Sequence, residues 1–211
     1  MTLRGERDAG VSEVISFVMI LAMLIAAFTV WALYAIPAGG EQMEDVHTAN
    51  IQMEFSAFKS GVENVWIAKS TGVVRESVFS LGPSPAESGM EILSFPITRA
   101  SGTLSVTAGI PVSDEKASGY YYPEVVYRGA NVYTDAVHLV FSGRNNSVTA
   151  FGPQGDVLYT LPGSDQFRVV VPEGLMSEVS GNGRAVIEYR LVDVIAGEDD
   201  VQYCVFRMGV R

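Results

Sequence analysis

The stretch from Val14 to Ile36, VISFVMILAMLIAAFTVWALYAI, constrains this chain more than any other. It contains 23 consecutive residues without a charge, and only the hydroxyls of Ser16 and Thr29 interrupt its apolar side chains. As a helix it would be about 34 Å long, and the hydrocarbon core of a bilayer is about 30 Å thick. We therefore predict a helix that spans a membrane.

Three kinds of segment fit such a stretch. A secretory signal peptide has an apolar core of about 7 to 15 residues and a small-x-small cleavage site. This core is longer, and the sequence at its end, Tyr34-Ala35-Ile36-Pro37-Ala38, has no clear Ala-x-Ala site. A retained membrane anchor and a pilin-type signal, which is cut before the apolar stretch, remain as alternatives.

The distribution of basic residues predicts the orientation of the span. Arg4 and Arg7 precede it, whereas the first basic residue after it is Lys59. Since basic residues close to a span stay on the cytoplasmic side, the N-terminus is expected inside and the C-terminal domain outside. This would be a single-pass protein of the cell membrane.

The remaining residues are enough for one domain with its own core, at roughly 170. The formal net charge is −10; residues 1–37 carry two arginines and three acids, which leaves −9 for the rest. An acidic domain repels phosphate backbones, so we expect no nucleic-acid partner.

Residues 37–72 are predicted to form a hinge and a juxtamembrane amphipathic helix. Pro37 and the glycines that follow it are expected to break or kink the helix. Helical periodicity then returns from Glu41 to Lys69, with a wide apolar face. We expect the C-terminal half of this face to pack on the chain's own domain, and Met43 to Met53 to contact other subunits.

Residues 73–211 predict an all-β domain, because short runs rich in Val, Tyr, Phe and Thr alternate with Gly, Pro, Asn and Asp. Short turns favour antiparallel pairing, and hence a sandwich or an open barrel in an α+β protein. The candidate strands are 73–81, 91–97, 103–108, 124–133, 136–141, 147–151, 156–161, 166–171, 184–194 and 201–208.

The residues Asp8-Ala9-Gly10-Val11-Ser12-Glu13-Val14-Ile15 resemble the start of archaeal type IV pilins and pilin-like proteins. In that family a short charged leader ends in a small residue, and a motif like Val-Ser-x-Val-Ile precedes the hydrophobic stretch. The specific part of the resemblance covers about 25 residues at the N-terminus, and beyond Ala108 it is one of general pattern.

The resemblance implies that residues 1–10 are a cytoplasmic leader and that residues 11–36 form the retained helix. A prepilin peptidase-like protease would cut between Gly10 and Val11, and Val11 would carry the new ammonium group. Bacterial type IV pilins pair that ammonium with a glutamate at the fifth mature position, whereas the acid here is Glu13, at the third. Glu13 is the candidate for subunit pairing; the alternative is that it lies at headgroup depth beside water.

Other chemistry is sparse in the sequence, and we expect no catalytic site, cofactor or metal. The two histidines, His47 and His138, are far apart, and Cys204 lies in an apolar run typical of a buried strand. Asn145-Asn146-Ser147 fits the N-glycosylation pattern in a predicted turn, with Asn145 as the acceptor.

We therefore expect a structural protein rather than an enzyme: a pilin-like subunit that assembles with copies of itself or with other pilins into a surface filament. The alternative is an uncleaved single-span protein whose β-domain binds a glycan, a cell-surface layer or a partner protein.

Overall fold

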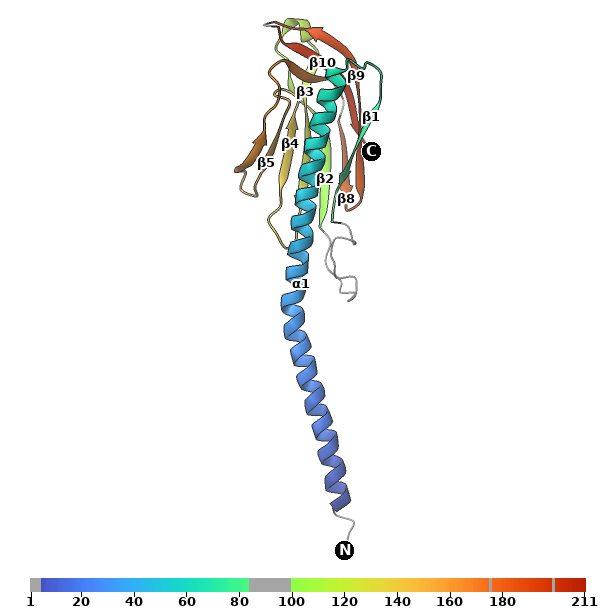
Figure 1. The fold of residues 1–211 in the computed structure, drawn as a ribbon, viewed down its shortest axis with the longest axis vertical. Coiled ribbons are helices and arrows are strands. Elements are labelled where there is room, and N and C mark those ends of the chain that lie inside the picture. The colour runs from blue at the N-terminus through green and yellow to red at the C-terminus, as the bar shows by residue number, and fades with distance from the viewer. Residues whose placement is uncertain (1–4, 84–99, 175, 199) are drawn as a thin grey trace.

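A computed structural model describes residues 5–83, 100–174, 176–198 and 200–211 of the chain. It consists of one long helix, α1 (Gly5–Ile67), followed by ten strands. Figure 1 shows the N-terminal half of α1 projecting from the β-domain, while its C-terminal half lies against the sheet. The expected α+β composition is confirmed.

The helix is continuous, which corrects the expected break at Pro37. Pro37 lies inside α1, and the residues on both sides of it are helical. An interior proline costs about 3 kcal/mol through a lost hydrogen bond and a steric clash. Gly39 and Gly40, just after it, are both buried, and Gly40 faces the Tyr133 ring of the β-domain. We infer that this packing outweighs the local preference, so residues 41–67 are not a separate helix.

The strands form one mixed, curled sheet, a half-barrel rather than a sandwich. Its order is β1-β9-β10-β7-β3-β4-β5-β6, with β2 paired to β3 and β8 paired to β2. The strands are β1 (Arg75–Ser80), β2 (Ser101–Pro111), β3 (Tyr120–Ala130), β4 (His138–Ser142), β5 (Ser147–Phe151), β6 (Val157–Leu161), β7 (Phe167–Pro172), β8 (Ser177–Gly181), β9 (Arg184–Ala196) and β10 (Gln202–Val210). A short 3-10 turn, η2 (Glu115–Ala117), precedes β3.

Nine of these strands lie where the sequence predicts them, but two features differ. The strand β8 was not predicted, because SEVSG has little apolar content. The pair β10–β7 is parallel, with Gln202 beside Phe167 and Val205 beside Val170, so the sheet is not purely antiparallel. Short turns predict hairpins but carry no information on pairing between strands distant in sequence. The candidate strand 91–97 lies outside the described residues.

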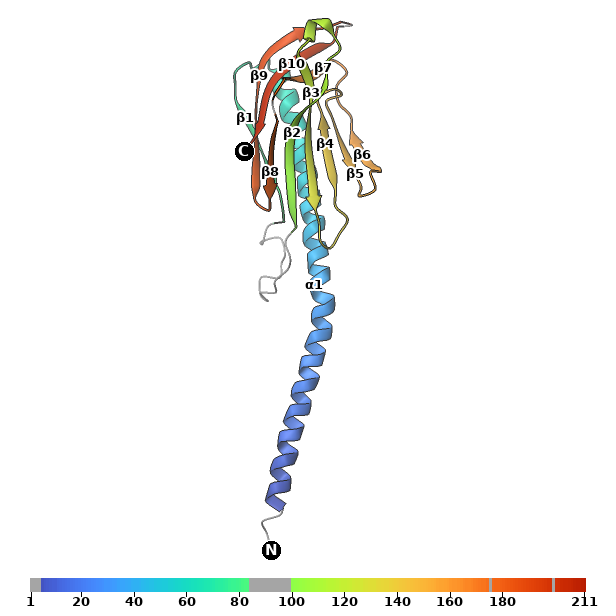
Figure 2. The ribbon, with the colours of Figure 1, turned by 180° about the vertical axis from the view of Figure 1, so that it is seen from behind.

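The C-terminal half of α1 occupies the place where a sandwich would have its second sheet (Figures 1 and 2). Its fully buried side chains belong to the same core as the inner face of the sheet: Ile51, Phe55, Phe58 and Val62. Phe58 is the centre of an aromatic cluster, with ring centroids 5.1 Å from Phe141 and 5.3 Å from Tyr189. Trp66 stacks on Phe167 at 4.3 Å. The expected packing of this half on its own domain is confirmed.

Candidate functional site: an exposed apolar helix and its junction with the β-domain

The first part of the candidate site is the apolar half of α1. Its large side chains are not buried by any other part of the described structure. Its large side chains from Val14 to Tyr34 are all exposed, between 41 % for Trp31 and 76 % for Tyr34. Complete burial of one such side chain is worth about 1.5–3 kcal/mol, so this surface strongly favours a non-aqueous environment. Among the described residues, α1 is the one helix that is long and apolar enough to cross a membrane.

The polar groups of this half do not prevent insertion into lipid. The Thr29 hydroxyl donates to the Ile25 carbonyl at 2.8 Å, which satisfies it within the helix. Backbone donors and acceptors of a continuous helix are satisfied in the same way, as a bilayer requires.

The predicted processing residues lie at the start of α1. The backbone of Gly10 and Val11 is helical, and the helix begins before them at Gly5. The Glu13 side chain is exposed and has no ionic partner among the side chains that the structure describes.

The second part of the site is the junction between α1 and the loop that joins β3 to β4. Glu44 is 1 % exposed, and its carboxylate accepts four hydrogen bonds from this loop. The donors are the backbone N–H of Val132 (2.6 Å), Tyr133 (2.8 Å) and Thr134 (2.7 Å), and the Thr134 hydroxyl (3.1 Å). A buried carboxylate needs such compensation, and here backbone amides provide it.

Gly40 allows the loop to approach the helix one turn before Glu44. A Cβ atom on Gly40 would lie 2.3–2.6 Å from ring carbons of Tyr133, closer than any real contact. The sequence predicts that the two glycines after Pro37 loosen the helix as part of a hinge. In the structure Gly40 instead makes room for an aromatic ring, so its small size serves packing and not flexibility.

One further contact continues the junction toward the core. His47 Nε2 lies 2.9 Å from the Tyr127 hydroxyl, and both side chains are buried. Burial raises the pKa of Tyr127 well above its ordinary value, and the nearby Glu54 carboxylate adds to this effect, so its hydroxyl stays protonated. Met43 is buried in the chain itself, which corrects its assignment to a subunit contact, whereas Met53 is 63 % exposed.

The remaining candidate residues are not brought together. His138 lies on β4 near the Phe151 ring, whereas His47 contacts Tyr127, and Cys204 is fully buried on β10. Burial raises the pKa of the Cys204 thiol to about 12, which makes it unreactive in the folded chain. Asn145 is exposed in the turn between β4 and β5. Among the described residues, no three His, Cys, Asp or Glu side chains gather as a metal site would require.

Sequence reasoning missed the role of Glu44. Its backbone donors lie 88 to 90 residues away, in a loop without a distinctive motif. Glu44 lies on a helix close to two exposed acidic residues, Glu41 and Asp45. This pattern predicts a glutamate that faces solvent.

Comparison with protein-family models, with curated proteins and with solved structures yields no significant match. The function is therefore inferred from this chain's own residues.

Proposed function

We propose that this chain is a structural, pilin-like subunit, held in the membrane by its N-terminal helix and assembled with copies of itself or other pilins into a surface filament. The observation that carries the proposal is the division of α1. One half is an exposed apolar rod, and the other half is the centre of the β-domain core.

An exposed apolar helix of this kind can serve two environments. In the bilayer its side chains contact lipid, and in a filament they can pack on the same helix of neighbouring copies. The polar β-domain stays outside this apolar layer in both states, which agrees with the orientation that Arg4 and Arg7 predict. Transfer from lipid to filament would require energy from a separate assembly machine.

The junction supports the proposal because it couples the two halves. The four hydrogen bonds to Glu44 and the contact of Tyr133 with Gly40 attach the domain to the helix near the end of the apolar segment. A subunit attached in this way places its domain at a fixed position whenever its helix packs against a neighbour. Regular repetition of such contacts is what a filament needs.

Processing between Gly10 and Val11 is part of the proposal. Removal of the leader would place a new ammonium group two residues before Glu13, at the tip of the apolar helix. In a dry filament core each of these charges needs a partner, and an ammonium–carboxylate pair between adjacent copies would supply both.

The decisive test is the mass of the N-terminus of the protein purified from its native membrane. We expect a mature chain that begins at Val11, and a Gly10→Val variant, in which the small residue is replaced, should retain the leader. An intact leader in the unaltered protein would contradict the proposal and favour the uncleaved single-span surface protein.

Assembly is tested separately, by electron microscopy of sheared surface filaments. Glu13→Ala should be processed like the unaltered chain but should yield fewer filaments. An unchanged yield would show that Glu13 is not the pairing acid, without affecting the result on processing.

A further inference from the structure

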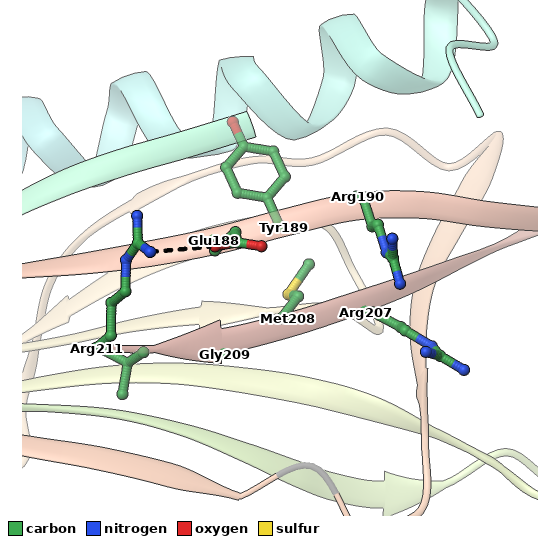
Figure 3. A pocket seen from close by; sticks show the side chains of 8 residues that line it. Glu188, Tyr189, Arg190, Arg207, Met208, Gly209 and Arg211 are labelled. Atoms are coloured by element: carbon green, nitrogen blue, oxygen red, sulfur yellow. Dashed lines mark ion pairs between the residues drawn. The ribbon is translucent and has the colours of Figure 1, made fainter. Parts of the chain in front are cut away.

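A pocket of about 390 Å³ lies on the β-domain, beside the middle of β9 and the C-terminal end of β10. Arg190 on β9 and Arg207 on β10 are direct neighbours across the two strands. Figure 3 shows both guanidinium groups on one side of these strands, whereas the adjacent Tyr189 points toward α1. The pocket is therefore on the face of the sheet that does not contact the helix.

The two arginines differ from the third arginine of the pocket in how their charge is balanced. Arg211 forms ion pairs with Glu76 and Glu188. Arg190 and Arg207 have neither an ion pair nor a side-chain hydrogen bond with any residue that the structure describes. Like charges directly opposite each other on neighbouring strands are destabilising. In a chain with a formal net charge of −10, two neighbouring arginines without a direct ion pair among the described residues are thus a local exception.

The shape of the pocket leaves room for a ligand beside this pair. Gly209 follows Arg207 by two residues and so lies on the same face of β10. A Cβ atom placed on Gly209 would have only the Ser177 hydroxyl oxygen nearby, at 4.0 Å. The space next to the guanidinium groups is therefore open.

We propose that Arg190 and Arg207 form a binding site for an oxyanion: a carboxylate, sulfate or phosphate group. A guanidinium group presents a planar set of donors that binds two oxygens of such a group at once. Two of them side by side can hold one oxyanion between them and remove their mutual repulsion. The site does not depend on filament assembly, and a single protein molecule contains it completely.

Isothermal titration calorimetry on the full chain, in a non-ionic detergent at low ionic strength, tests the site with sodium sulfate, sodium phosphate and sodium acetate in separate titrations. We expect binding of at least one of these ions. Arg190→Gln and Arg207→Gln should each weaken it by about tenfold or more, because each removes charge-assisted hydrogen bonds. Arg207→Lys keeps the charge without the planar donor set. Its affinity for the ion should lie between that of the unaltered chain and that of Arg207→Gln.

Arg144→Gln is the matched control, since Arg144 is exposed in the turn between β4 and β5 and its replacement changes the net charge equally. It should leave binding unchanged, and the thermal transition of each variant checks that it is folded. Absence of binding to all three ions, or an equal loss in Arg144→Gln, would overturn the site.

The same titration with dextran sulfate, and with neutral dextran as its control, distinguishes the source of the oxyanion. If dextran sulfate binds more tightly per sulfate group than inorganic sulfate does, and Arg207→Gln loses this binding, the site is supported and assigned to a polymer that carries oxyanions. Equal binding per sulfate, also lost in Arg207→Gln, supports a site for the free ion. Binding of dextran sulfate that Arg207→Gln leaves unchanged would overturn the site.

Discussion

Replacement of Glu44 by alanine is the sharpest test of the junction between helix and domain. The substitution removes one acceptor group and leaves three backbone amides and one hydroxyl without their partner. The loop is only partly buried, so water can reach these donors, and each lost amide bond should cost about 1 kcal/mol. The expected loss of stability is about 3 kcal/mol.

The predicted loss can be measured as a shift of the thermal transition. For a chain of this size, 1 kcal/mol corresponds to about 2–4 °C, so Glu44→Ala should lower the transition by about 6–12 °C. Amide hydrogen exchange gives a local readout: the N–H groups of Val132, Tyr133 and Thr134 should exchange faster than in the unaltered chain.

Glutamine at this position separates the charge from the shape of the side chain. One oxygen of Glu44 accepts three of the four hydrogen bonds, and the other accepts the remaining one from Val132. In Glu44→Gln a terminal NH₂ replaces one oxygen, so at least one loop amide faces a donor. We expect the stability of Glu44→Gln to lie between that of the unaltered chain and that of Glu44→Ala.

Glu41→Ala is the control, because Glu41 is exposed one turn earlier on the same helix. It should shift the transition by little, as most exposed substitutions do. A transition in Glu44→Ala that matches that of Glu41→Ala, with unchanged exchange in the loop, would refute the reasoning.

Three other substitutions test separate parts of the structure by their effect on stability. Gly40→Ala should destabilise the chain by about 1–3 kcal/mol through overpacking against Tyr133. If Gly40 were instead on an open helix surface or in a free hinge, alanine would stabilise the chain. Restoration of stability by Tyr133→Ala in the same chain would confirm the contact. Phe58→Ala should cost about 3–5 kcal/mol in denaturant unfolding, since the side chain is fully buried, and Met53→Ala, on the exposed face of the same helix, should cost little; similar losses would contradict the assigned core. Desolvation by burial, and then the charge of Arg128, lower the pKa of His138 from its ordinary value of 6.5, so the unfolded chain binds this proton first and stability falls as the pH drops below about 6.5. His138→Gln should reduce that dependence, and an identical pH profile would show that His138 does not contribute to it.

Much of the fold follows from local sequence patterns. The apolar stretch from Val14 to Ile36 predicts a helix by its length. Helical periodicity from Glu41 to Lys69 predicts a wide apolar face, of which Phe55, Phe58 and Val62 are buried and Met53 is exposed. Nine strands were located from alternation and turn residues, because these signals lie within the strands and their neighbouring loops. Strand β8, with its sequence SEVSG, has almost no such signal.

The candidate site divides in the same way. The exposed apolar half of α1 and the position of Glu13 could be anticipated, since both are properties of one segment. The role of Glu44 could not, because its partners are 88 to 90 residues away. The pairing of Arg190 with Arg207 likewise depends on the register between β9 and β10.

The sequence by itself determined that this chain has an apolar helix able to cross a membrane, followed by a strand-rich acidic domain. Those properties depend on composition and periodicity, which every segment carries on its own. Only the tertiary structure decided that α1 continues through Pro37, that Gly40 accommodates Tyr133, and that β10 pairs with β7 in parallel. The contact of Gly40 with Tyr133 and the pairing of β10 with β7 join segments that are distant in sequence, and we infer that the packing around Gly40 also holds the helix through Pro37. Local residue preferences carry no information on such contacts.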